Sequence, residues 1–231
     1  MSNVIDYCRR IIKSLDGDLV RAQYSLAIYV ASRNDKGTVN QELENALKSC
    51  TKNAANHVVV FNHIDLIHQQ DAALTICRMM DKSNSTNSFV TLIKKAKSKR
   101  ELLIDLAKAQ YLRADIDSAH KALQDEYVKK QNARIDQFIS IEKQLRNSDD
   151  YKKLKNLRDE VLAHHTTKAR SSKAHINMVK NCLESLETLL HIAYSIFLNT
   201  DYPPRTGYEF AKKDAQKFWQ LIIKSPKTFD A

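Results

Sequence analysis

Apolar residues recur every three or four positions along most of the 231-residue chain. That period is typical of an α-helix that buries one face and leaves the other in water. The clearest example lies near the C-terminal end, where Val179, Leu183 and Leu190 share one helical face. The chain has only three glycines and three prolines, and a many-stranded sheet would need more of these turn residues. The pattern therefore predicts an all-α fold: a single domain, residues 1–231, built as a bundle of long antiparallel helices with a long central helical hairpin.

Breaks in this period divide the chain into nine predicted helices. Asp16-Gly17-Asp18 separates the first helix from the second, and Ser88 is expected to cap the fifth. Three capping boxes, in which Ser or Thr precedes Gln or Glu by three positions, begin at Thr38, Ser98 and Thr206. The predicted helices end before 16 and then span 18–33, 38–49, 52–80, 89–95, 99–147, 150–165, 175–199 and 208–223.

The predicted helix 99–147 is unusually long because no glycine or proline interrupts it. Its apolar positions thin out after Leu112, so we expect its second half to protrude or to pair with another chain. A break at "NSDD", residues 147–150, is the alternative end. Elsewhere Val59, Phe61, Ile64, Ile67, Leu74, Cys77 and Met80 form the apolar stripe of one predicted helix. The last predicted helix carries Phe210, Phe218, Trp219 and Ile222.

The charge balance indicates an anionic partner. Lysine and arginine number 37 against 27 aspartates and glutamates, a net charge of +10. A surplus of this size favours nucleic acid first and membrane surfaces second, although solubility alone also explains it. No apolar run approaches the roughly 18 residues that span a bilayer, and the charged N-terminus is no signal peptide. Four scattered cysteines, without a CxxC pair, indicate a reducing, cytoplasmic compartment: Cys8, Cys50, Cys77 and Cys182.

Candidate chemistry lies in the stretch "LKNLRDEVLAHHTTK", residues 154–168. Leu154, Leu157 and Val161 form an apolar stripe, with Arg158 on one flank and His164 on the other. These two side chains are about 120° apart around the helix and about 9 Å apart along it. One straight helix therefore does not aim both at one phosphate, whereas two copies facing each other across a dimer axis do. His165, nearer the arginine's side, competes for the same role.

An arginine and a histidine of this kind suit metal-free RNA cleavage. The 2′-OH of RNA attacks the adjacent phosphate, a histidine moves the protons, and an arginine binds the phosphate oxygens as charge builds. The spacing alone is weak evidence, because Arg113–His120 and Arg170–His175 match it as well. A histidine at a helix end that meets the last carbonyls is the simpler interpretation.

The order "LRDEVLAHH", at the end of a helix that precedes a long apolar one, resembles the signature of the HEPN superfamily. The segment 74–95, "LTICRMMDKSNSTNSFVTLIKK", looks like the turn of its abortive-infection U-type branch. The resemblance implies an all-helical, metal-independent and cofactor-free ribonuclease that works as a homodimer in a prokaryotic phage-defence or toxin-type system. RNA, and an antitoxin protein, are the partners it implies. Arg158 matches the signature arginine, Asp159 the polar residue after it and His164 the histidine; Arg78 and Asp81 match a second signature of unassigned role.

One departure from the family pattern keeps a second interpretation open. Relatives often carry an acidic residue shortly after the histidine, where this chain has His165, Thr166 and Thr167. A non-catalytic helical module that binds RNA or protein is therefore the alternative. Positive side chains expected to contact nucleic acid surround the candidate site, and Tyr151 is the one aromatic close to it in sequence, which favours contacts to backbone over bases. The expected nucleic-acid contacts are Lys152, Lys155, His165, Lys168 and Arg170.

Two further patterns predict little chemistry. Asp65-x-x-His68 and Asp117-x-x-His120 resemble half of a helical di-iron site, but such sites use glutamates and two further carboxylates, and a solvated helix face explains these residues too. No metal is predicted. The basic run "KKAKSKR", residues 94–100, is typical of a solvated face.

Overall fold

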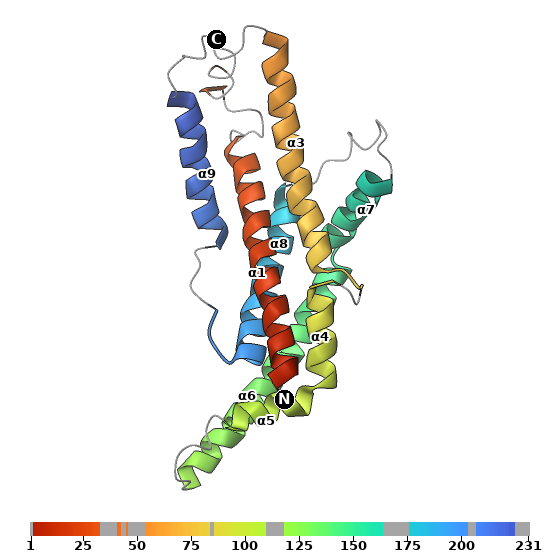
Figure 1. Cartoon of the computed structure of the whole chain (residues 1–231), viewed down its shortest axis with the longest axis vertical. Helices are drawn as coiled ribbons and strands as arrows, with labels where there is room; N and C mark the ends of the chain where they lie inside the picture. The colour runs from red at the N-terminus through yellow and green to blue at the C-terminus, as the bar shows by residue number, and fades with distance from the viewer. Residues whose placement is uncertain are drawn as a thin grey trace.

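The computed structural model describes residues 2–32, 41–42, 45, 54–83, 86–109, 118–163, 176–202 and 207–224, without the side chains of 2, 54–65, 118–120, 161–163 and 222–223. These described residues form eight α-helices and one π-helical segment, η2, and they contain no strand (Figure 1). The all-α prediction is therefore confirmed. The elements are α1 (Ser2–Ala31), α3 (Ala54–Met79), α4 (Phe89–Ser98), α5 (Arg100–Ala109), α6 (Ser118–Asn147), α7 (Asp149–Ala163), α8 (Ile176–Ala193), η2 (Tyr194–Leu198) and α9 (Gly207–Lys224).

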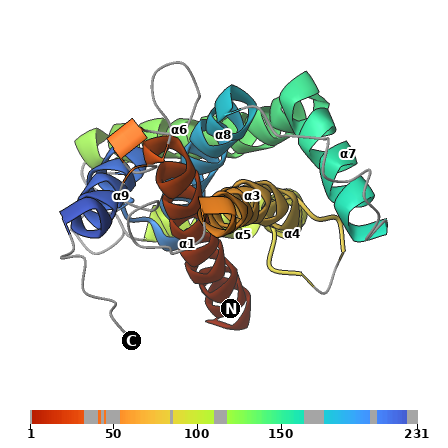
Figure 2. The ribbon, with the colours of Figure 1, turned by 90° about the horizontal axis from the view of Figure 1, so that it is seen from above.

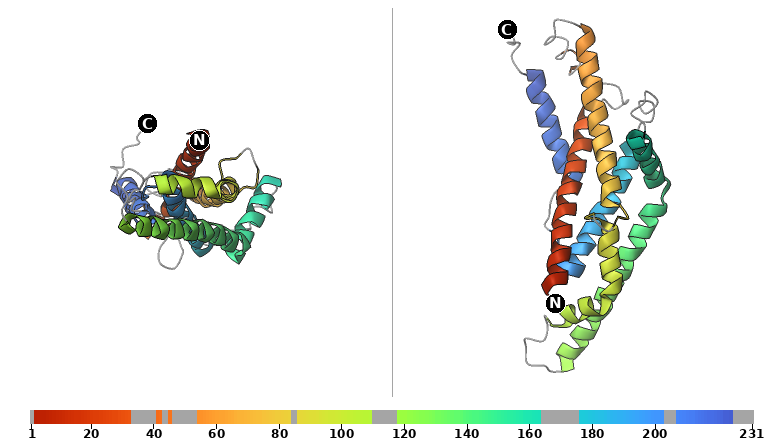
Figure 3. Two further views of the ribbon diagram at one scale, coloured as in Figure 1. Left: turned by 90° about the horizontal axis from the view of Figure 1, so that it is seen from below. Right: turned by 45° about the vertical axis from the view of Figure 1, so that its right-hand side comes forward.

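Helix α1 lies at the centre of the bundle. It packs against α3 on one side, α9 on the other and α8 behind (Figure 2). Helix α6 crosses α8, and α7 lies at the edge, where it contacts the end of α3 and α8. Figure 3 shows α5 and the first part of α6 extending the molecule beyond the N-terminal end of α1.

The core follows the apolar faces of these helices. On α8 the predicted face is confirmed, since Val179, Leu183 and Leu190 are buried. Phe138 of α6 is fully buried, with edge-to-face contacts to Phe89 of α4 and Phe197 of η2 at centroid distances of 6.3 and 6.4 Å. These rings connect three elements that are distant in sequence.

The predicted break at Asp16-Gly17-Asp18 is wrong, because α1 continues through it. The carboxylates of Asp16 and Asp18 both make contacts with other parts of the fold. Asp16 accepts a hydrogen bond of 2.9 Å from the Tyr202 hydroxyl, and Asp18 forms an ion pair with Arg78 of α3. Side-chain contacts with two other parts of the fold thus outweigh the weak local preference of this tripeptide for a turn.

The prediction of an unbroken helix over 99–147 is also wrong. Arg100, at the start of α5, donates to Asn132 at 2.9 Å and to Asp136 at 2.7 Å in the middle of α6. Helices α5 and α6 therefore lie antiparallel. They form a helical hairpin, but this hairpin lies within the segment that was predicted to be one helix. Ser98 does not cap α5; its hydroxyl contacts the Lys95 carbonyl of α4 instead.

Two other helix ends agree with the sequence. Ser88 caps α4 by accepting from the Thr91 amide at 3.3 Å, and α6 ends in "NSDD", where Ser148 accepts from the Tyr151 amide at 3.2 Å to start α7. The capping boxes at Thr38 and Thr206, most of the predicted helix 38–49 and Cys50 lie outside the described residues, so the single-domain prediction also stays a prediction.

Helix α9 buries two alanines and a tryptophan against α1. Ala211, Ala215 and Trp219 pack on α1, where the Trp219 indole donates to the Ile28 carbonyl at 3.1 Å. Phe210 and Phe218 of the same helix are exposed. Ile67 of α3 is likewise 47% exposed, not buried. On α9, the small side chains of Ala211 and Ala215 allow a closer approach to α1 than phenylalanines would.

Candidate functional site

Helix α7 presents the signature arginine at the surface. Its first turn carries Asp149 and Asp150. Their negative charges stabilise the helix, because they lie at the positive end of the helix dipole. Leu154 and Leu157 are buried as predicted, while the side chain of Val161 lies outside the description. Because this stripe faces α3 and α8, Arg158 emerges on the flank.

Arg158 is held by its neighbour in sequence. Its Nε and Nη2 atoms both donate to Oδ1 of Asp159, at 2.9 and 2.6 Å. Burial lowers the pKa of Arg158, but hydrogen bonding and attraction to Asp159 outweigh it, so the net shift is upward. The guanidinium thus stays charged and oriented, with its side chain still 23% exposed.

Arg158 opens onto a basic hollow of about 330 Å³. It lies where three segments meet: residues 80–82 directly after α3, the end of α6 and residues 151–158 of α7. Five of its eight lining residues are cationic and one is acidic, so the hollow is suited to an anion. The lining residues are Met80, Asp81, Lys82, Arg146, Tyr151, Lys152, Lys155 and Arg158.

The cations differ in how far they are neutralised within the protein. Arg146 pairs with Glu142 of its own helix, and Lys152 has a loose, exposed contact of 3.8 Å with Asp149. Among the described residues, no acidic side chain pairs with Lys155. Its charge is therefore available to a ligand.

Tyr151 also lines the hollow. It is 5% exposed, and no described group makes a hydrogen bond to its hydroxyl. Burial raises the pKa of this phenol to about 12, with the nearby Cys77 and Asp81 adding to the shift. The hydroxyl therefore stays protonated and offers a donor to an anion in the hollow, but the buried ring is not placed to stack on bases.

The two residues of the second sequence signature, Arg78 and Asp81, lie in different surroundings. Arg78 faces α1, where it pairs with Asp18, next to a second ion pair between Arg21 and Asp71. Asp81 lies in the basic hollow, and its carboxylate accepts from the Ser83 amide at 3.1 Å. The structure thus brings Asp81 and Arg158, from two segments predicted separately, to one hollow.

Several predicted site residues lie outside the described residues. Helix α7 ends at Ala163, directly before His164, and the description resumes at Ile176. Of the predicted nucleic-acid contacts, Lys152 and Lys155 line the hollow, whereas His165, Lys168 and Arg170 are not described. The sequence missed Lys82 and Arg146, because only the fold brings them near Arg158.

No group of three or more His, Cys, Asp or Glu side chains able to hold a metal occurs in the described ranges. Of the histidines in the possible di-iron pattern, His68 is the one whose side chain is described, and burial lowers its pKa.

Cys8, Cys77 and Cys182 are free and buried. Burial raises their pKa values to about 11, 11 and 12, so these thiols are inert in the fold. Across the part of the chain with assigned structure, no helix is long and apolar enough to span a bilayer.

Comparison with known proteins assigns the chain to a family. Searches of curated proteins and of solved structures each returned no match. The HEPN family model described as AbiU2 matches residues 6–218, which run from α1 into α9 and include both signature segments. The match covers most of the chain, and the all-helical fold agrees with it. The chain therefore belongs to the AbiU2 family of HEPN proteins, an abortive-infection type of helical module.

Proposed function

We propose that this protein is a metal-independent endoribonuclease of a prokaryotic phage-defence or toxin-type system. The observation that carries the proposal is the basic hollow: Arg158, held by Asp159, shares it with Lys152 and Lys155. A ribonuclease that works without a metal needs such cations, because they must stabilise the negative charge on phosphate in the transition state.

The reaction is an internal transfer within the RNA. The ribose 2′-oxygen bonds to phosphorus as the 5′-oxygen leaves, which gives a 2′,3′-cyclic phosphate and a free 5′-hydroxyl. His164 acts as general acid or base in moving the proton from the 2′-OH or to the leaving oxygen. Arg158 binds the non-bridging oxygens, and Asp159 keeps the guanidinium in place.

The site is shared between two subunits. Helical spacing predicts Arg158 and His164 on opposite flanks of the apolar stripe, so a homodimer would bring the arginine of one copy to the histidine of the other. Helix α7 lies at the edge of the bundle, where a second copy has access to it (Figure 2). Lys152 and Lys155, with His165, Lys168 and Arg170, bind the RNA backbone, and an antitoxin protein that covers this surface would silence the enzyme.

A non-catalytic RNA-binding module is the second candidate. The observation that favours it is the run His165-Thr166-Thr167, which lacks the acidic residue that would orient the imidazole of His164. Such a module would use the same hollow to hold phosphate without cutting the chain.

Incubation of the protein with single-stranded RNA in excess EDTA separates the two functions. The ribonuclease proposal predicts fragments with cyclic phosphate ends, and predicts that His164→Ala and Arg158→Ala each abolish cleavage while circular dichroism stays unchanged. Salt-sensitive binding without fragments would support the module instead. Full cleavage by a well-folded His164→Ala variant would remove the histidine from the mechanism.

A further inference from the structure

A second hollow, of about 630 Å³, lies between the N-terminal end of α1, α5, α6 and η2. It shares no lining residue with the basic hollow at Arg158. The volume is in the range of pockets that bind small organic molecules. Neither the cleavage chemistry nor the phosphate contacts proposed above use it.

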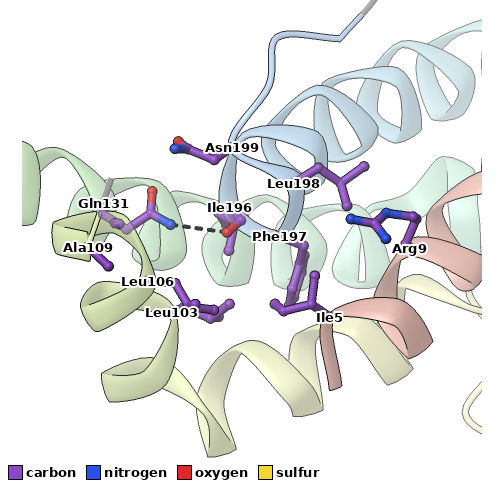
Figure 4. Close-up of a pocket in the computed structure, with 11 residues that line it drawn as sticks. Ile5, Arg9, Leu103, Leu106, Ala109, Gln131, Ile196, Phe197, Leu198 and Asn199 are labelled. Atoms are coloured by element: carbon purple, nitrogen blue, oxygen red, sulfur yellow. Dashed lines mark hydrogen bonds between the residues drawn. The ribbon is translucent and has the colours of Figure 1, made fainter. Parts of the chain in front are cut away.

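Most of the lining is apolar. Figure 4 shows the side chains of Ile5, Leu103 and Leu106 opposite those of η2. From η2, Phe197 and Leu198 also line the hollow. This wall favours a ligand with an apolar body, because burial of that body contributes roughly 25 cal/mol per Å².

A buried hydrogen-bond acceptor marks one end of the hollow. Gln131 of α6 is 1% exposed, and its Nε2 donates to the Ile196 carbonyl at 3.1 Å. That bond fixes the orientation of the amide. The other amide atom, Oε1, has no hydrogen-bond partner within the described structure. A buried acceptor without a partner is costly. Because Oε1 is itself fully buried, a ligand N–H or O–H reaches it only when the side chains around it move, and the hydrogen bond that then forms removes this cost.

The irregular end of α8 supplies the surroundings of this amide. The chain passes from α8 into the π-helical segment η2 and then into Asn199, which adopts left-handed angles (φ 49°, ψ 40°). A π-helical turn shifts backbone carbonyls out of the regular α-helical pattern and is often found at functional sites. The Ile196 carbonyl, one of those in η2, is the group that anchors Gln131.

A cation marks the other end. Figure 4 shows the guanidinium of Arg9 turned toward the hollow beside Leu198. Arg9 has an ion pair of 2.8 Å with Asp6, but both side chains are about half exposed. Exposed pairs of this kind contribute little, so the guanidinium remains available to an anionic group.

We propose that this hollow binds a small organic acid with an apolar body, whose acid group pairs with Arg9 and whose N–H or O–H donates to Oε1 of Gln131. The apolar body lies on Leu103, Leu106 and Phe197 between these two points. This proposal does not depend on RNA cleavage.

The probe 2-anilinonaphthalene-6-sulfonate carries these three features, since it has an aromatic body, an anilino N–H and a sulfonate at the far end. Its fluorescence rises when it leaves water, so a titration measures binding. We expect one saturable site, and we expect Arg9→Ala to weaken binding about tenfold. Arg10→Ala is the matched control: Arg10 stacks on Tyr7 and does not line the hollow, and its loss should leave affinity unchanged.

Two further measurements identify the site. Leu106→Trp fills the hollow and should abolish binding while circular dichroism and the thermal midpoint persist. The ether analogue 2-phenoxynaphthalene-6-sulfonate, which lacks the N–H, should bind more weakly than the anilino probe to the wild-type protein, and Gln131→Met should remove that difference.

The proposal is overturned if Leu106→Trp leaves titration unchanged, since the probe would then bind elsewhere, for example at the exposed Phe218 and Leu221 of α9. Equal effects of Arg9→Ala and Arg10→Ala would also overturn it. Equal affinity of the two probes for the wild-type protein would remove the role of Gln131.

Discussion

Lys155 provides a test of the basic hollow that does not depend on cleavage. It lines the hollow, and among the described residues no acidic side chain pairs with it, so its whole charge is available to a phosphate. Each phosphate contact to a single strand contributes about 0.7 to the slope of log affinity against log salt. Over a fourfold rise in salt, from roughly 50 to 200 mM, one contact therefore accounts for about a 2.5-fold fall in affinity.

Fluorescence anisotropy with a labelled single-stranded RNA measures this slope. The common background is His164→Ala, which the ribonuclease proposal predicts to be unable to cleave the RNA. Lys155→Ala should lower the slope by about 0.7 and weaken binding more at low salt than at high salt. Lys153→Ala is the control, because Lys153 is an exposed lysine on the same helix outside the hollow. An unchanged slope for Lys155→Ala, or an equal change for Lys153→Ala, would refute the assignment of the hollow to phosphate.

Three other predictions concern the scaffold. Phe138→Ala should lower the free energy of unfolding by about 3–5 kcal/mol in urea titrations, because it removes a fully buried ring and two edge-to-face contacts. Gly207→Ala should cost about 1–2 kcal/mol, since Gly207 has a φ of +46°, and an added Cβ would also lie 2.8 Å from Glu187 Oε1. Burial raises the pKa of Glu187 above its unfolded value, so the folded state holds this proton more tightly and ionisation at higher pH is destabilising. Glu187→Gln should therefore be more stable than wild type at neutral pH, and that advantage should shrink as pH falls through the folded-state pKa; an advantage independent of pH would contradict this explanation.

The sequence predicted α-helical structure and most helix ends, because both depend on local features of the chain. Apolar spacing identified the buried face of α8, and the hydroxyls of Ser88 and Ser148 start α4 and α7. The errors occurred where distant contacts decide. Asp16 and Asp18 suggested a turn, yet Tyr202 and Arg78 hold them within one helix.

For the candidate site, the sequence predicted several residues but not how they are arranged in space. Arg158 and Asp81 were predicted from separate segments, and only the packing of α7 on the end of α3 brings them to one hollow. Arg78, three positions before Asp81, instead binds α1 through Asp18. Lys82 and Arg146 could not be assigned from spacing, because their proximity to Arg158 arises from three segments that meet in space.

The central claim is that the arginine of one subunit works with the histidine of its partner. Mixing purified Arg158→Ala and His164→Ala proteins, each inactive alone, tests it directly in an RNA cleavage assay with EDTA. In a two-fold dimer each mixed pair holds one intact site, so an equal mixture allowed to exchange subunits should recover about a quarter of the wild-type activity. A mixture that forms mixed dimers but stays as inactive as its two components would contradict a site shared between subunits.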